Sequence, residues 1–568
     1  MTTTQAKEKL YALEARLCAF EHAAGLLYYD GDTAAPSGTA DNRGRTLSVL
    51  NEEIYQLVTS DETREILTTL KAAENELDEK TNRIVTLFLR SMEETARIPM
   101  DEYVEFQRLT NESSAVWHEA KLADDYARFA PYIDKIVGTL RRFAGYVRPE
   151  LSAYDYLLNK YEPGLTTETL DRFFADLRES IVPLIARVCA AKPIDESPLH
   201  VPFPIDKQRA LTDAVMKRML LDRAHVGVGE TEHPFTTNFS KYDVRITTHY
   251  FADNFASGMF STIHEGGHAL YESNTADELA YTRLGEGVSM AGHESQSRFY
   301  ENIIGRSRAF VSLIAPELRA LCPALESVSE EALYRAFNAS RPSLIRTEAD
   351  ELTYCLHILV RYEIEKKLFA GELTAKELPA EWNRMYREYL GVDVPSDREG
   401  VLQDSHWSNG MFGYFPSYAL GSAYAAQLFS KMKETVDVDG DVARGDLSRY
   451  VREEKLDEAN YLLFALALRY VSSLENVRNP HSRADFPARL ALDGSQPPTA
   501  IRLSSTLARL LPQYDFLEPV IPYAAYDDFR SFRAAAPCDL ASLAISPRYA
   551  PREADFIADV FREYITEV

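Results

Sequence analysis

Apolar residues in the first half of the chain recur with the period of an α-helix. Between residues 10 and 27 they are three or four positions apart, which gathers them on one face of a helix. The same spacing predicts helices over residues 62–92, 132–147 and 169–188, and the proline-containing segments 36–38, 163–164 and 193–204 predict breaks. These apolar stripes are packing surfaces, so they indicate a helical body rather than a reacting group.

One stretch departs from the helical pattern. Residues 243–251, DVRITTHYF, are rich in β-branched side chains and partly alternate between polar and apolar residues, which predicts a short strand. Helical spacing then predicts helices over residues 257–272, 283–309, 330–337, 347–368 and 379–390. The sequence therefore predicts a mainly α fold with a small β element directly before the helix at residues 257–272.

Composition indicates how the chain is divided. Residues 434–440, ETVDVDG, have the character of an acidic linker, and prolines are frequent beyond residue 480. We expect an N-terminal helical half at residues 1–205, a second half at residues 206–446, and a C-terminal tail at residues 447–568. The tail contains many apolar residues that need burial, so we expect it to pack on the body.

The chain is acidic, with 62 Lys and Arg residues against 87 Asp and Glu residues and a formal net charge of −25. This charge disfavours nucleic acid as a partner, because phosphate binding needs a basic surface. No apolar run approaches the about 20 residues of a membrane-spanning helix, and the N-terminal segment lacks an apolar signal core. The five cysteines are scattered, which argues against disulfides or a thiolate zinc site and favours a cytoplasmic location.

The most informative segment is His264-Glu265-Gly266-Gly267-His268. On a helix the two histidines lie one turn apart on one face, so both imidazoles can reach one metal ion. Glu265 is offset from them and can act as general base on a water at the metal. Two glycines inside a helix cost about 1 kcal/mol each relative to alanine, a penalty that close approach of another group explains.

A zinc site in a hydrolase needs a third protein ligand and one open position. Glu294 follows His268 by 26 residues on a predicted second helix, and two histidines plus one carboxylate are a common set for peptide hydrolysis. We therefore favour Glu294. The competing candidates are His293, Glu286 and Glu301. Glu272, one turn beyond His268, either orients an imidazole or is a solvated helix charge.

Several motifs of the chain are similar to those of one enzyme family. HEGGHALYE and HESQSR at the predicted metal site are accompanied by HPF at 233–235, DVRIT at 243–247, IRTEAD at 345–350, GVLQDSHW at 400–407 and GYFPSYALG at 413–421. In this order they resemble the carboxypeptidase Taq family of HExxH metallocarboxypeptidases. The resemblance covers about residues 10–446, and the tail does not share it.

The resemblance implies a large, bilobed, helical metallopeptidase with a deep active-site groove. It also implies one divalent metal ion per chain, zinc with cobalt as an alternative, release of single C-terminal amino acids with broad specificity, and a homodimer. By matched position, His264, His268 and Glu294 are the expected metal ligands, and Glu265 is the expected general base.

A carboxypeptidase must also recognise the free α-carboxylate of its substrate, and a planar guanidinium does this with two hydrogen bonds. Arg346 is the first candidate for this role and Arg245 the second. The strand that contains Asp243 and Thr247 is expected to offer its edge to the substrate backbone. His233 is expected either to line the groove or to be structural.

The attack on the scissile carbonyl develops a negative oxygen that needs a donor besides the metal. The candidates are His406, Tyr414 and Tyr418, with Gln403, Asp404 and Trp407 expected to support them. The first alternative function is a related helical oligopeptidase that cuts internally or removes dipeptides. The second, less expected because both histidines and both glutamates are present, is a binding protein with a defunct metal site.

Overall fold

The computed structural model describes residues 1–433 and 436–447. Two compact units are distinguished: of the described residues, Met1–Ala72 and residues 84–447 belong to the first, and Ala73–Arg83 belongs to the second. The predicted tail lies outside the described residues from residue 448 onward. The predicted division at residue 205 remains a prediction.

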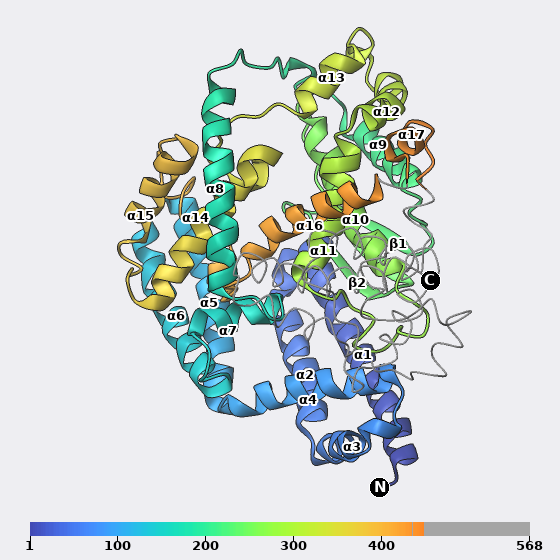
Figure 1. The fold of residues 1–568 in the computed structure, drawn as a ribbon, viewed down its shortest axis with the longest axis vertical. Coiled ribbons are helices and arrows are strands. Elements are labelled where there is room, and N and C mark those ends of the chain that lie inside the picture. The colour runs from blue at the N-terminus through green and yellow to red at the C-terminus, as the bar shows by residue number, and fades with distance from the viewer. Residues whose placement is uncertain (434–435, 448–568) are drawn as a thin grey trace, which may run out of the picture. The chain divides into compact units, whose positions relative to one another are not determined.

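The described chain is mainly helical, as predicted (Figure 1). The α-helices are α1 (Thr3–Thr33), α2 (Ala40–Thr59), α3 (Asp61–Ala72), α4 (Glu79–Arg97), α5 (Met100–Ala123), α6 (Tyr126–Val147), α7 (Ala153–Tyr161), α8 (Thr167–Cys189), α9 (Ile205–Arg218), α10 (Phe255–Ser273), α11 (Met290–Arg298), α12 (Arg308–Leu321), α13 (Glu330–Phe337), α14 (Glu351–Ala370), α15 (Leu378–Met385), α16 (Pro416–Met432) and α17 (Val438–Ala443). No helix of these described segments is both long and apolar enough to span a bilayer. The bilobed shape and the groove remain predictions.

Three of the predicted segments were wrong in part. Residues 62–92 are not one helix, because a 3-10 turn at Glu74–Glu76 separates α3 from α4. Residues 283–309 become helical only at Met290, and α11 then continues into a π-helix at Phe299–Gly305. The predicted linker is partly the helix α17, whose Val438 and Val442 are buried. Val438 and Val442 are four positions apart, as on one face of a helix. Two apolar residues among acidic ones are too few to predict a helix from the sequence.

The described part of the second unit is short. The 3-10 turn Glu74–Glu76 leads into the first residues of α4. The carboxylate of Asp78 accepts a hydrogen bond from the backbone N–H of Thr81 at 2.9 Å, which satisfies a free N–H group at the start of that helix.

The helices around the predicted site have well-defined ends. The Ser289 hydroxyl accepts a hydrogen bond from Gly292 N at 3.0 Å at the start of α11. The Asp350 carboxylate accepts hydrogen bonds from two backbone N–H groups at the start of α14, and Gly371 ends that helix with φ 79°. Caps of this kind satisfy backbone groups that the helix itself leaves free.

The β element is a three-stranded sheet, of which the sequence predicted one strand. Its strands β1 (Val226–Glu230), β2 (Thr236–Ser240) and β3 (Asp243–Thr248) are ordered β1-β3-β2. β1 is parallel and β2 antiparallel to β3, and Val244 to Ile246 have partners on both sides. The predicted pairing of the β3 edge with substrate was therefore wrong, since both rows of its backbone groups are already engaged.

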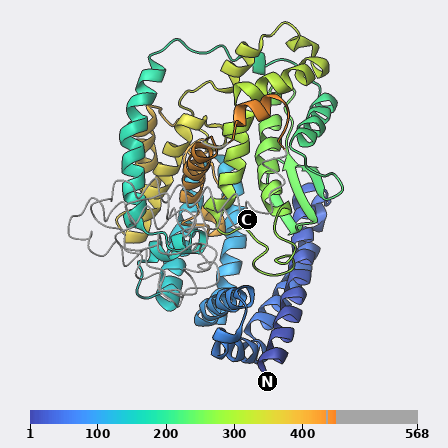
Figure 2. The ribbon, with the colours of Figure 1, turned by 45° about the vertical axis from the view of Figure 1, so that its right-hand side comes forward.

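The two faces of this sheet contact different helices, α10 and α1, which lie near it in the ribbon views (Figures 1 and 2). Thr236 and Asn238 of β2 reach side chains of α10. Phe239 stacks on His22 of α1, with ring centroids 4.9 Å apart. Because side chains alternate along a strand, each residue of the sheet can be assigned to the α10 face or the α1 face.

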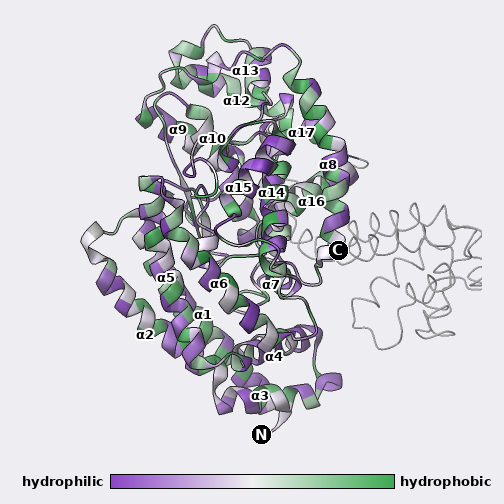
Figure 3. Cartoon of the chain, turned by 90° about the vertical axis from the view of Figure 1, so that its left-hand side faces the viewer, coloured by the Kyte–Doolittle hydropathy of each residue, from purple (hydrophilic) through white to green (hydrophobic). Residues whose placement is uncertain are grey.

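Two clusters of buried apolar side chains form the interior of the first unit. The first is built mainly from α6, α7, α8, α14 and residues 401–420, and the second mainly from α9, α10, α12, α13 and the sheet. Long helices show both apolar and polar bands along their length (Figure 3). Ala291 of α11 belongs to the first cluster and Ile263 of α10 to the second, so the predicted ligands stand on helices anchored in different clusters.

Candidate metal centre and active site

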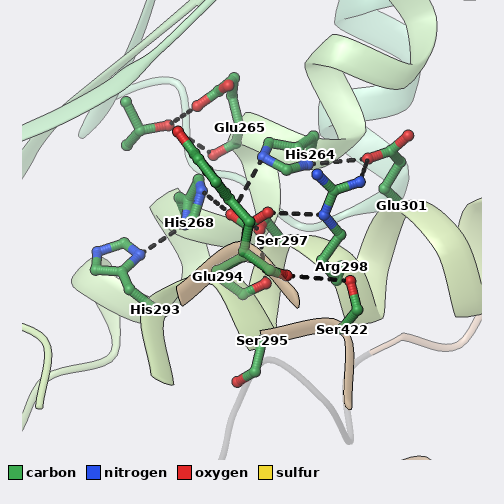
Figure 4. A network of polar contacts seen from close by, with 12 residues as sticks. His264, Glu265, His268, His293, Glu294, Ser295, Ser297, Arg298, Glu301 and Ser422 are labelled. Carbon is green, nitrogen blue, oxygen red and sulfur yellow. Dashed lines mark hydrogen bonds and ion pairs between the residues drawn. The ribbon is translucent and has the colours of Figure 1, made fainter. Parts of the chain in front are cut away.

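The structure brings the three predicted metal ligands together (Figure 4). His264 and His268 lie one turn apart on α10, and their Nε2 atoms are 3.7 and 3.5 Å from Oε2 of Glu294 on α11. One ligand atom from each of the three residues lies within 4.8 Å of the others. Among the described residues, this is the one group of at least three His, Cys, Asp or Glu side chains that could hold a metal ion.

Glycines let the helices around Glu294 approach one another. A Cβ atom on Gly267 would lie 2.8 Å from the carbonyl oxygen of Gln296 in α11. A Cβ atom on Gly421 of α16 would lie 2.6 Å from Cβ of Glu294. Any larger residue at these positions would push α11 away from α10 or α16. The prediction that a helix glycine of the histidine motif marks a close approach is confirmed.

The imidazole of His264 is oriented by a carboxylate. Its Nδ1 atom lies 2.9 Å from Oε2 of Glu301, and Glu301 is paired in turn with Arg306 at 2.8 Å. When Nδ1–H donates to this carboxylate, Nε2 is left with a free lone pair for a metal. Glu301, an alternative third ligand in the sequence, thus contacts the far side of a ligand imidazole.

The imidazole of His268 is oriented by a longer chain of contacts. Its Nδ1 atom lies 2.6 Å from Nδ1 of His293, whose Nε2 lies 2.6 Å from Oε1 of Glu272. Asn238 of β2 donates to Oε2 of the same glutamate at 2.6 Å. Glu272 therefore holds His293, and through it His268. This chain leaves Nε2 of His268 free when each histidine donates toward Glu272.

The charges at the site suit a cation. Burial by itself would raise the pKa of Glu294, but the positive charge of Arg298, together with the two neighbouring histidines, outweighs it and holds that pKa well below its usual range. Arg298 Nε donates to Oε1 of Glu294 at 2.7 Å. Burial lowers the pKa of His268 to about 3, so its imidazole is neutral, as a metal ligand must be. Two imidazoles and one carboxylate match the donor set of a catalytic transition-metal site.

Glu265, the predicted base, is held by a residue that the sequence did not single out. Its side chain is buried, and Oε2 accepts a hydrogen bond from the Thr236 hydroxyl at 2.6 Å. Burial raises the pKa of Glu265. Thr236 follows directly after His233-Pro234-Phe235, but only the pairing of β2 with β3 brings it to α10.

Arg346 lies in a buried network of charges. Its Nε donates to Oδ1 of Asp404 at 3.0 Å, and its Nη1 donates to the Tyr354 hydroxyl at 2.9 Å. Arg361 shares the same carboxylate, with Nε 2.7 Å from Oδ2 of Asp404. The network therefore contains two guanidinium groups around one carboxylate. The guanidinium of Arg298 lies 4.1 Å from the centre of the Tyr354 ring, which connects the network to Glu294.

The structure brings His406, Tyr414 and Tyr418 together as well. Nε2 of His406 lies 3.1 Å from the Tyr418 hydroxyl, and the two tyrosine rings have centroids 5.2 Å apart. The Arg346 guanidinium lies 4.9 Å from the centre of the Tyr418 ring. Burial lowers the pKa of His406 to about 3 and, together with the charge of Glu294, raises the pKa of Tyr414 to about 12. All three groups are therefore neutral at physiological pH.

Asp243, Arg245 and Thr247, the alternate residues of the DVRIT segment, lie on the face of the sheet away from α10. Arg245 is paired with Asp243 at 2.5 Å and lies 5.7 Å from the ring centre of Tyr29 in α1. Thr247 is fully buried, and its hydroxyl accepts a hydrogen bond from Phe235 N at 2.8 Å. His233 is exposed in the loop between β1 and β2. The structure does not bring Asp243, Arg245 and Thr247 to the face that contains the metal ligands.

Comparison with known proteins identifies the family of this chain. Residues 9–455 match the family model described as Carboxypeptidase Taq (M32) metallopeptidase. The chain belongs to this family. The predicted family and its mainly helical fold are thereby confirmed, and the protein is a metallocarboxypeptidase, a hydrolase of peptide bonds.

Relatives cover most of the chain. Carboxypeptidase 1 of Bacillus subtilis (strain 168) is 40% identical over 444 residues, which are 78% of this chain and 88% of the relative. Thermostable carboxypeptidase 1 of Thermus thermophilus is 36% identical over 464 residues, 79% of this chain and 91% of the relative. The solved structure of Pyrococcus furiosus carboxypeptidase, described as Apo-Mg, has a TM-score of 0.77 at 34% identity and covers 80% of this chain and 92% of that one.

Proposed function

We propose that this metallocarboxypeptidase releases single C-terminal amino acids from peptides with broad side-chain preference. One zinc ion, replaceable by cobalt, would be held by His264, His268 and Glu294. The observation that carries the proposal is the convergence of two imidazole Nε2 atoms on the Glu294 carboxylate within 4.8 Å. The contacts at both Nδ1 atoms favour this use of Nε2.

Glu265 is the proposed general base. A zinc ion at this site would supply a Lewis acid that polarises the scissile carbonyl and acidifies a water. The carboxylate of Glu265 takes the proton of the attacking water and later delivers it to the leaving amine. The hydrogen bond from Thr236 to Oε2 supports this role, because it fixes the carboxylate and leaves Oε1 to receive the proton.

His406, Tyr414 and Tyr418 are proposed to donate to the oxyanion that develops on the carbonyl. A neutral imidazole has one N–H group, and its Nε2 faces the Tyr418 hydroxyl at 3.1 Å. If Tyr418 donates to Nε2, the proton is on Nδ1, a buried atom with no partner among the described residues. If Nε2 donates instead, the Tyr418 hydroxyl keeps its own hydrogen. The second arrangement leaves the Tyr418 hydroxyl as a donor for substrate, and it is the one proposed here.

Arg346 is the proposed binding group for the substrate α-carboxylate. Arg346 and Arg361 together have two positive charges against the single negative charge of Asp404. The surplus charge favours an additional carboxylate at this place. Arg245 stays the second candidate. Its single positive charge is already balanced by Asp243, so it has no surplus charge for a substrate carboxylate.

Backbone pairing with the substrate is proposed for β2, the outer strand beside Glu265, since β3 has no free edge. Asp243 and Thr247 would contribute by holding β3 in place. His233 would line the site from the loop before β2. We also propose a homodimer, on the strength of the family resemblance. A cytoplasmic location is proposed because Cys18, Cys189, Cys322 and Cys355 are free thiols.

The test uses the purified full-length chain, with metal analysis and mass spectrometry of products. The expected result is one zinc ion per chain and stepwise loss of single residues from a free-acid peptide. Internal cuts or released dipeptides would favour the oligopeptidase alternative. A metal-loaded chain without any turnover would favour a binding protein.

A further inference from the structure

Glu365 of α14 is a fully buried carboxylate to which the proposed reaction assigns no role. It accepts three hydrogen bonds. The indole N–H of Trp407 donates to Oε1 at 2.7 Å, and the backbone N–H of Gly413 and the Tyr154 hydroxyl donate to Oε2, each at 2.8 Å. A carboxylate is the side chain that can accept all three, because an amide has one acceptor atom and presents donors on the other.

Two of these donors belong to one short segment. Trp407 directly follows His406, and Gly413 directly precedes Tyr414. Glu365 therefore holds the segment 407–413 at both of its ends. Each end is adjacent to a residue that is proposed to act on the oxyanion.

A second contact from the same helix holds the other side of His406. Arg361, one turn before Glu365 on α14, donates from Nε to Oδ2 of Asp404 at 2.7 Å. Asp404 lies two residues before His406, and Trp407 lies one residue after it. The backbone around His406 is thus fixed to α14 from both directions.

Tyr414 is restrained in a similar way. Gly413 has φ +84°, and a Cβ atom there would lie 2.8 Å from the backbone carbon of Leu157 in α7. The Tyr414 ring meets the edge of Tyr161, also in α7, with centroids 5.0 Å apart. The hydrogen bond to Glu365 therefore holds Gly413 against α7 at a position where no other residue fits.

We propose that Glu365 is a positioning residue for His406 and Tyr414, which it fixes through Trp407 and Gly413. The inference rests on the proposed function, in which these two residues contact the reacting carbonyl. Burial raises the pKa of Glu365 to about 7, against the opposing effect of its three hydrogen bonds. Keeping this carboxyl group ionised in the interior therefore lowers the stability of the folded state. A displacement of about 1 Å in a group that acts on the transition state can reduce the rate by about 100-fold.

The test begins with Glu365→Gln in the metal-loaded, full-length enzyme. The expected result is a kcat lowered by about 10- to 100-fold with KM changed by less than about threefold, because the affected contacts form in the transition state. Metal content should be unchanged. Trp407→Phe, which removes one of the two bonds to the segment, should lower kcat by a smaller factor.

The matched control is Tyr154→Phe, which removes the third hydrogen bond to the same carboxylate. Tyr154 lies in α7 outside the segment, so this variant should lower the melting temperature and leave kcat within about twofold of the wild type. Equal losses of kcat in Tyr154→Phe and Glu365→Gln would reduce Glu365 to a structural residue and overturn the inference. If Glu365→Gln does not fold, Trp407→Phe decides: an unchanged kcat overturns the inference.

A double-variant cycle separates this inference from the proposed function. In a His406→Ala, Tyr414→Phe background, Glu365→Gln should lower kcat by less than about threefold, because the groups it positions are gone. If Glu365→Gln lowered kcat by the same factor in this background as in the wild type, the positioning role would be overturned, while the role of His406 and Tyr414 would stand. If the background alone retains wild-type kcat, the proposed oxyanion role has failed, and the positioning role fails with it.

Discussion

The Thr236 hydroxyl donates a hydrogen bond to Oε2 of Glu265, with the two oxygen atoms 2.6 Å apart. The donor stands on β2 and the acceptor on α10, so the small sheet fixes the carboxylate of the proposed base. The same strand holds Glu272 through Asn238 at 2.6 Å. β2 therefore supports both the base and the contacts behind a ligand histidine.

Thr236→Val tests this support. Valine has the shape of threonine without the hydroxyl, so Glu265 loses one hydrogen bond to its charged form, a loss of about 1.5 to 3 kcal/mol or one to two decades in rate. We expect kcat to fall by that factor with metal content unchanged. The matched control is Thr237→Val, because Thr237 is the next residue of β2 and lies on its α1 face. Similar losses in both variants would contradict the assignment.

Glu265→Gln tests the base itself. The amide is nearly isosteric but cannot take a proton, and removal of a general base lowers the rate by about 10² to 10⁴. We expect that loss in kcat together with a full complement of bound metal. A variant that keeps more than half of the wild-type turnover would show that another group is the base.

The histidine motif could be read from the sequence because its geometry is local. His264 and His268 meet on one face of a single helix, so their spacing alone places both imidazoles together. The helical periodicity of residues 132–147 and 330–337 was equally local, and both segments are helical. β1 and β2 were missed because VGVGE contains two glycines and TTNFS is short and polar, and because strand pairing depends on residues far apart in the chain.

The residues around the ligands could not be predicted for the same reason. Thr236, Asn238 and Glu301 reach the site only through sheet pairing or helix packing. Glu365 stands in the sequence YEIEKK, which resembles an exposed helix surface, and it becomes buried because Trp407 and Gly413 cover it. A charge with long-range partners leaves no pattern in its neighbours along the chain.

Glu301→Gln should weaken metal binding without abolishing it. The carboxylate accepts from Nδ1 of His264 at 2.9 Å, and loss of such a partner lowers metal affinity by about 10- to 100-fold. Zinc affinity should be measured by competition with a chelator of known strength. The control is Glu331→Gln, an exposed glutamate paired with Arg308, whose affinity should equal that of the wild type. His264→Ala and Glu294→Ala should instead lose the metal.

Arg346 should decide the preference for a free C-terminus. Amidation of a good substrate removes its carboxylate, and loss of a charge-assisted pair lowers kcat/KM by about one to two decades. In Arg346→Ala the free acid and the amide should be cleaved at similar rates. Arg245→Ala should keep the preference, because Arg245 is paired with Asp243 on the α1 face. If Arg245→Ala lost the preference for the free acid and Arg346→Ala kept it, Arg245 would be the residue that binds the substrate carboxylate.

Glu162 should make folding stability depend on pH. It is buried, and the backbone N–H of Ala291 in α11 donates to its Oε2 at 3.1 Å. Burial raises its pKa from 4.5 to about 7, against the opposing effect of its hydrogen bonds with Ser289 and Ala291. The folded state thus binds a proton that the unfolded state has already released between these two values. The free energy of unfolding should therefore fall as pH rises through this range, by about 3 kcal/mol at most from this group.

Glu162→Gln removes that titration, since an amide keeps no charge at any of these pH values. Urea unfolding of the variant and the wild type should be compared at pH 5 and pH 8. The two proteins can differ in their free energy of unfolding at pH 5. Between pH 5 and pH 8, the free energy of unfolding of the variant should rise by about 1 to 3 kcal/mol relative to that of the wild type. The control is Glu326→Gln at an exposed position, where the difference from the wild type should stay constant. A constant difference for Glu162→Gln as well would mean that α11 is held by an ionised carboxylate across the whole range.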